Sequence, residues 1–214
     1  MFSEINVMGC FPTPIWLLSI ANHQELNRPL IAVIDKIRAA EKWDTRPLVG
    51  REGLGDHLQT RDDLHTLKEF AAFNQMAINA AKQVFERLQY EYETFYITGC
   101  WANVSIKGYS HKEHVHPNNF LSGVYYAKAH PGCGPIVFDD PRPQVKVLIP
   151  NIKAPNLYNT HNFEIQPKEG DLVLFPSWLP HRVRVNTTDQ ERVSVSFNIM
   201  FKGKFGFERA AASL

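Results

Sequence analysis

Residues 192–200, with the sequence RVSVSFNIM, show the strict alternation of a β-strand. Successive side chains of a strand point to opposite faces, so one face here is apolar and the other is polar. The polar face fits either solvent or the inner surface of an open barrel that binds a polar molecule, and periodicity leaves both interpretations open. The apolar set is Val193, Val195, Phe197 and Ile199, and the polar set is Arg192, Ser194, Ser196 and Asn198.

The chain changes character near residue 90, and strand patterns dominate after that point. Short segments rich in aromatic and β-branched residues alternate with Gly- and Pro-containing turns, which is typical of a barrel or sandwich. Helices that precede the strands, instead of alternating with them, argue against a doubly wound α/β fold. We therefore predict a mainly β fold with N-terminal helices. The predicted strands are 95–106, 120–128, 136–138, 163–166, 171–175 and 192–201.

Two helices are predicted before residue 90. The first starts near Asn27-Arg28-Pro29, because proline is tolerated in the first helical turn. The second carries one apolar stripe over 64–88, and the acidic residues 62 and 63 at its start suit the helix dipole. Between the two helices, 45–60 reads as a loop or irregular hairpin. A second long segment, 139–162, has four prolines and is expected to be a flap beside the site.

The composition of the chain limits the classes of function that it can have. The 214 residues carry a formal net charge of +1, which gives no electrostatic footprint for nucleic acid or an anionic membrane. Three widely spaced cysteines disfavour a disulfide framework or a structural zinc site, and free thiols fit a reducing cytoplasm. The first 25 residues have no basic leader region and contain two prolines, so we expect neither a signal peptide nor a membrane span.

Three histidines are candidate metal ligands. His114 and His116 are two residues apart, so a strand would place both imidazoles on one face. His181 follows an apolar strand and the proline-containing turn PSWLP, which would hold its ring rigidly. Neutral imidazole binds iron, copper, nickel and zinc. The alternative interpretation is a polar loop and a surface histidine, because nine histidines in the chain make chance pairs easy.

Arg192 is a candidate anchor for a carboxylate. Its planar guanidinium can bind a carboxylate through two hydrogen bonds, and the Ser194 hydroxyl on the same strand face can add a third. Asn103 and Tyr125 could hydrogen-bond the same ligand, or Asn103 could satisfy the backbone alone. For an isolated arginine, an ion pair with Asp189 or Glu191 would be the simpler interpretation.

Six sequence blocks follow one another along the strand-rich part of the chain. They are Trp101-Ala-Asn103, His114-Val-His116-Pro, Leu121-Ser-Gly-Val-Tyr-Tyr126, Phe138-Asp-Asp-Pro-Arg142, Phe175-Pro-Ser-Trp-Leu-Pro-His181 and Arg192-Val-Ser-Val-Ser-Phe-Asn198. Together these blocks resemble the 2-oxoglutarate/Fe(II) oxygenases of bacteria and tailed phages, a family within the prolyl-hydroxylase-like superfamily. The resemblance covers residues 95–201 and implies a double-stranded β-helix, or jelly-roll, core.

The resemblance implies that His114 and His181 bind iron and that Arg192 anchors 2-oxoglutarate. Residue 116 stands where the wider superfamily has aspartate, although this family commonly has histidine there. His116 could therefore complete a three-histidine site, or serve the substrate while water fills the third position. Asp139 or Asp140 could supply a carboxylate from another strand, which we regard as the weaker alternative.

We therefore predict one domain over 1–214, with helical support over 1–90, a jelly-roll catalytic core over 91–203 and a tail over 204–214. The predicted activity is that of an oxidoreductase, an Fe(II)- and 2-oxoglutarate-dependent dioxygenase acting on an unidentified substrate. The alternatives are a three-histidine, cupin-like metalloenzyme that does not use 2-oxoglutarate, and a jelly-roll binding module without turnover. Symmetric dimers are common, and the sequence adds nothing to that base rate.

Overall fold

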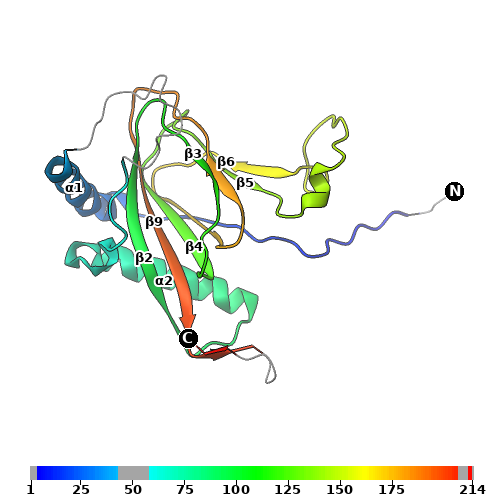
Figure 1. Cartoon of the computed structure of the whole chain (residues 1–214), viewed down its shortest axis with the longest axis horizontal. Helices are drawn as coiled ribbons and strands as arrows, with labels where there is room; N and C mark the ends of the chain where they lie inside the picture. Colours follow the sequence, from blue (N-terminus) through cyan, green and yellow to red (C-terminus); the bar gives the residue numbers. More distant parts are fainter. Residues whose placement is uncertain (1–3, 43–57, 207–211, 214) are drawn as a thin grey trace.

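The computed structural model describes residues 4–42, 58–206 and 212–213. Two antiparallel sheets form its body (Figure 1). The large sheet has the order β1-β7-β4-β9-β2, and the small sheet has the order β3-β8-β5-β6. The bounds are β1 (Trp16–Ser19), β2 (Thr94–Ser105), β3 (His111–His114), β4 (Leu121–Lys128), β5 (Ile136–Asp139), β6 (Asn162–Ile165), β7 (Asp171–Pro176), β8 (His181–Val183) and β9 (Arg192–Lys202).

The strand order is that of a jelly roll, so the predicted fold is confirmed. From β2 to β9 the chain passes between the two sheets, and only β5 and β6 are consecutive neighbours in one sheet. Apolar side chains from both sheets pack between them, including Tyr126 and Phe175 from the large sheet and Phe138 from the small sheet. The polar positions of β9 face this interior, where three of them line a cavity. The inner face of an open barrel is thus the correct interpretation of the alternation.

Helices α1 (His23–Glu41) and α2 (Ala71–Leu88) cover the outer face of the large sheet (Figure 1). Apolar residues of both helices share one core with β2, β4, β7 and β9. Phe73 of α2 packs edge-to-face on Phe197 of β9, with ring centroids 5.6 Å apart. The helical and the strand-rich halves of the chain are therefore joined by a common hydrophobic core.

Gly123 in β4 is required for this packing. A Cβ atom built at Gly123 would lie 2.3 Å from the Phe197 ring and 2.8 Å from Leu174. The missing side chain therefore lets Phe197 and Leu174 approach the β4 backbone closely. The irregularity in the pairing of β4 with β9 falls later, between Tyr126 and Lys128.

The predicted helices differ from the observed ones at their starts. Helix α1 begins at His23, and Pro29 lies inside it. The predicted second helix is interrupted at its start: two short 3₁₀ turns, Leu64–Thr66 and Lys68–Phe70, precede α2. Tertiary hydrogen bonding explains the second difference, because the Asp62 carbonyl accepts the N–H of Cys100 in β2 and draws this segment onto the sheet.

Five of the described strands were not predicted. β1 pairs with β7, so the N-terminal segment is not purely helical, and β3 and β8 are too short to show a period. The predicted loop 45–60 lies outside the described residues except for 58–60. In the predicted tail, β10 (Lys204–Phe205) pairs with β11 (Ala212–Ser213). No described helix has the length and apolar character needed to cross a membrane.

Candidate metal centre

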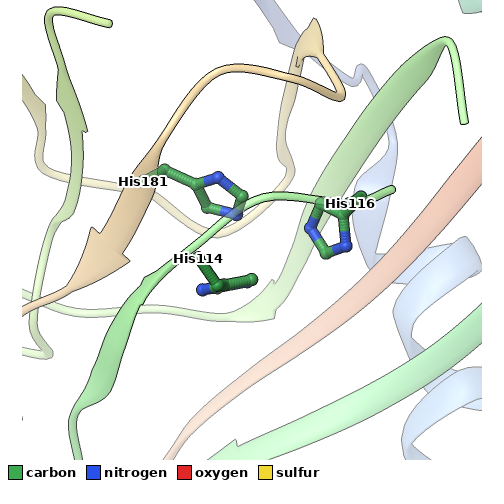
Figure 2. A group of neighbouring side chains, drawn as sticks. All are labelled: His114, His116 and His181. Carbon is green, nitrogen blue, oxygen red and sulfur yellow. The ribbon is translucent and has the colours of Figure 1, made fainter. Parts of the chain in front are cut away.

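The three candidate histidines converge on one point (Figure 2). His114 ends β3, His181 begins β8, and these two residues are direct partners in the antiparallel ladder. His116 lies two residues beyond the end of β3, and its backbone N–H donates to the Ser177 carbonyl at 2.9 Å. One ring nitrogen from each histidine lies within 4.8 Å of the other two. His114 and His116 thus point to the same place, although only His114 belongs to the strand that was expected to carry both.

Hydrogen bonds fix the tautomers of two of these rings. Nδ1 of His114 lies 2.8 Å from the Lys112 carbonyl, and Nδ1 of His181 lies 3.0 Å from the Leu179 carbonyl. A carbonyl oxygen only accepts hydrogen bonds, so each Nδ1 carries the proton and donates it. The lone pair of each Nε2 is then free for a metal, as in many metal-binding histidines.

Burial keeps the His116 and His181 rings neutral at physiological pH. Burial, with a contribution from the adjacent His114, lowers the pKa of His116 to about 4. Burial, again with a contribution from His114, lowers the pKa of His181 to about 3. Because a metal binds neutral imidazole, these shifts favour a ligand role over a charged one.

The two aspartates considered as alternative ligands have other partners. Asp139 forms an ion pair with Arg182, and Asp140 pairs with Arg142 at 2.6 Å. The Arg142 hydrogen bond also lowers the pKa of Asp140. Among the described residues, no aspartate or glutamate lines the cavity that contains the three histidines. The geometry therefore disfavours a carboxylate ligand from this neighbourhood.

The histidines share a partly open cavity of about 50 Å³ with the predicted carboxylate anchor. Arg192 is 2% exposed, its Nη1 donates to the Gly134 carbonyl at 2.8 Å, and its Nε has no hydrogen-bond partner. No ion pair joins Arg192 to any carboxylate in the described part of the chain. A buried cation without a counter-ion is costly, so the cavity is suited to an anion.

Asn103 and Ser194 also line this cavity, as predicted for a ligand-binding pair. They face each other across the β2–β9 ladder. The amide nitrogen of Asn103 donates to Ser196 at 3.5 Å, while its carbonyl oxygen is buried and has no partner. This leaves an unused acceptor in the cavity beside the Ser194 hydroxyl.

The prediction for Tyr125 is wrong, and Tyr126 takes its place. The Tyr125 hydroxyl donates to Asn27 of α1 at 2.6 Å, so this ring faces the helices. Tyr126 faces the cavity, and its ring centroid lies 5.9 Å from the Arg192 guanidinium carbon. Adjacent residues of a strand point to opposite faces, and the pair of tyrosines gives no sign of which one is inside.

Two further cavity residues were missed as site residues. His111 lines the cavity, and its ring stacks on His114 with centroids 4.4 Å apart. An irregularity between His111 and His114 in β3 turns both rings to the same side, which no residue spacing reveals. Trp101 also lines the cavity, with its ring centroid 5.6 Å from that of His116.

The predicted flap borders a second, larger cavity. Part of 139–162 and the N-terminal residues 8–13 enclose about 720 Å³, and this cavity shares no lining residue with the histidine cavity. Leu179 links it to the histidines, because the Leu179 carbonyl accepts the hydrogen bond of His181 Nδ1 at 3.0 Å. The segment is thus beside the site without entering the cavity of the three histidines.

Comparisons with known proteins agree with this geometry. Residues 99–198 match a family model described as "Putative 2OG-Fe(II) oxygenase". No curated protein matches the sequence. A Pseudomonas putida prolyl-4-hydroxylase has a similar structure, with a TM-score of 0.58, 17% identity, and coverage of 87% of this chain and 92% of that one.

Two other solved structures are similar at lower sequence identity. SnoN, an α-ketoglutarate-dependent epimerase of nogalamycin biosynthesis, has a TM-score of 0.65 and 12% identity, with 92% and 84% coverage of the two chains. HygX from Streptomyces hygroscopicus, solved with nickel and 2-oxoglutarate, has a TM-score of 0.55 and 9% identity, with 87% and 81% coverage. Residues 99–198 thus match the family described as putative 2OG-Fe(II) oxygenases, and the fold built around them is shared with the prolyl-4-hydroxylase and SnoN.

Proposed function

We propose that this chain is an Fe(II)- and 2-oxoglutarate-dependent oxygenase that oxidises a still unidentified substrate. The observation that carries the proposal is the buried, unpaired Arg192 in the same cavity as three convergent histidines. A metal and an anion are the two charges that such a cavity can accommodate. 2-Oxoglutarate unites the two requirements, because one end chelates a metal and the other end is a free carboxylate.

In this proposal His114, His116 and His181 hold the iron through ring nitrogens. The fixed Nδ1 protons of His114 and His181 direct Nε2 of both rings to the metal. Three neutral ligands leave the full +2 charge on the ion, whereas a carboxylate ligand would reduce it. The higher charge strengthens the attraction of the site for an anionic cosubstrate.

Arg192 binds the distal carboxylate of 2-oxoglutarate, and Ser194 donates one further hydrogen bond to it. Asn103 and Tyr126 line the same space and orient the cosubstrate from either side. The low exposure of these side chains excludes water, which strengthens each polar contact. Dioxygen would be the oxidant, with two electrons supplied by oxidative decarboxylation of 2-oxoglutarate to succinate and carbon dioxide and two by the substrate, and bound iron would supply the redox chemistry.

The direct test is anaerobic titration of the iron-loaded protein with 2-oxoglutarate. A visible charge-transfer band that saturates with 2-oxoglutarate is the expected result. Iron binding without such a band would favour the three-histidine metalloenzyme that does not use 2-oxoglutarate. Steady succinate release under air with any added substrate excludes the non-catalytic binding module. The free thiols of Cys10, Cys100 and Cys133 support a cytoplasmic location for this chemistry.

A further inference from the structure

The turn between β7 and β8 contains a buried serine that contacts three other parts of the fold. Ser177 is fully buried. Its backbone N–H donates to the Phe120 carbonyl at 3.1 Å, and its own carbonyl accepts the N–H of His116 at 2.9 Å. Its hydroxyl lies 2.8 Å from the Ser122 hydroxyl in β4. One residue thus ties the turn to the sheet and to a candidate metal ligand.

The hydroxyl groups form a chain with a defined direction. Ser122 donates its only hydroxyl proton to the side-chain oxygen of Asn198 in β9, at 2.7 Å. It must therefore accept the proton of Ser177. The donors run from Ser177 to Ser122 to Asn198, and these three side chains are 0%, 1% and 8% exposed. Buried networks with every member satisfied hold their elements in one arrangement.

The hydrogen-bonded series from Ser177 to Asn198 is placed to fix the positions of two of the three histidines. His116 has no strand to hold it, because β3 ends at His114, and its backbone N–H is held instead by the Ser177 carbonyl. His181 leaves the same turn four residues later, and its Nδ1 donates to Leu179, whose own N–H donates to the Pro176 carbonyl. A shift of the turn would therefore move both rings relative to His114.

We propose that Ser177 is a positioning residue for the metal centre, acting through the Ser177–Ser122–Asn198 hydroxyl chain. Its hydroxyl anchors the turn between β7 and β8 to strands β4 and β9 of the large sheet. This turn then fixes the positions of His116 and His181. Ser177 lines neither cavity and touches no reacting group. The inference rests on the proposed function only in requiring that the three histidines bind a divalent metal.

The test is Co(II) titration of the metal-free protein and of its Ser177→Ala variant, followed by the visible d–d absorption of the bound ion. Loss of a hydrogen-bonded group that orients metal ligands costs about 10- to 100-fold in metal affinity. We expect the Kd for Co(II) to rise at least tenfold, and the d–d spectrum to change because the ligand geometry changes. Ser122→Ala breaks the same chain from its other side and should give the same result.

Ser105→Ala is the matched control. Ser105 is fully buried in β2, and its hydroxyl has no hydrogen-bond partner. Its replacement removes the same atom from the core without touching the turn, so the Co(II) affinity should stay within about twofold of the native value. Unfolding of each metal-free variant by urea measures the separate cost to stability.

The outcomes separate the two proposals. If the native protein binds no Co(II), the proposed metal site fails, and this inference fails with it. If the native protein binds Co(II) and Ser177→Ala binds it equally well, the positioning role alone is refuted, whatever the stability of the variant. In a His116→Ala background, Ser177→Ala should have a smaller effect than in the native background. An undiminished effect would show that Ser177 does not act through His116.

Discussion

Replacing Arg192 by methionine should abolish tight 2-oxoglutarate binding while leaving the metal in place. The side chain is 2% exposed, so water screens its charge poorly, and no carboxylate of the described chain competes for it. Truncating one partner of a buried charge pair costs about 2–5 kcal/mol. We expect about 3–4 kcal/mol here, which is about a 100- to 1,000-fold rise in Kd.

The same substitution should not destabilise the protein in the absence of 2-oxoglutarate. The native ligand-free protein keeps a desolvated cation with one hydrogen bond, to the Gly134 carbonyl, and an Nε without a partner. Methionine fills similar space without the charge, so the lost hydrogen bond is offset by relief of the desolvation cost. The free energy of unfolding should change by about 1 kcal/mol or less.

Anaerobic calorimetric titration of the metal-loaded protein with 2-oxoglutarate measures the effect. Arg184→Met is the matched control, because Arg184 directly follows β8 and forms a half-exposed ion pair with Glu164 at 2.7 Å. Its Kd for 2-oxoglutarate should equal the native value. The reasoning is refuted if Arg192→Met binds 2-oxoglutarate within about threefold of native protein, or if both variants weaken binding equally.

Three other outcomes are expected. Gly123→Ala should lower the free energy of unfolding, measured in urea, by about 1–3 kcal/mol, because its Cβ would clash with Phe197. Gly99→Ala is the control, because the nearest atoms to its Cβ would lie at an ordinary contact distance of 3.7 Å. Equal losses of unfolding free energy in the two variants would contradict the clash. Lowering the pH from about 6.5 to 3 should destabilise the metal-free protein, because imidazoles of the unfolded chain take up protons near pH 6.5 whereas the pKa values of His116 and His181 in the fold are about 4 and 3. A free energy of unfolding that does not fall between pH 7 and pH 5 would contradict this. Co(II) at about 100 times its Kd should raise the free energy of unfolding by about 2.7 kcal/mol. The His181→Ala variant is the control and should not be stabilised by the same Co(II) concentration.

The order of chemical groups along the chain was readable without a structure. The alternation in 192–200 predicted a strand with one buried and one polar face, because the period of a strand is a local property. The aromatic and β-branched segments predicted a β-rich fold, and the blocks around the histidines indicated the oxygenase family. These predictions hold because strand propensity and family blocks depend on nearby residues.

The helix starts and the short strands depended on tertiary contacts. The second helix was predicted from its apolar stripe, but the Asp62–Cys100 hydrogen bond and the 3₁₀ turns at its start required the sheet to be present. β8 has three residues, and only its ladder with β3 and β5 defines it. Such elements are stabilised by partners far away in the chain, so local propensity carries little information about them.

The sequence alone determined which residues could form a site, namely His114, His116, His181 and Arg192, because their chemistry is a property of each side chain. Only the tertiary structure decided how they meet. It made Tyr126 the cavity residue instead of Tyr125, because the strand must turn one of two adjacent rings towards the helices. It also left Arg192 buried without a counter-ion, because burial and pairing are set by segments distant in sequence.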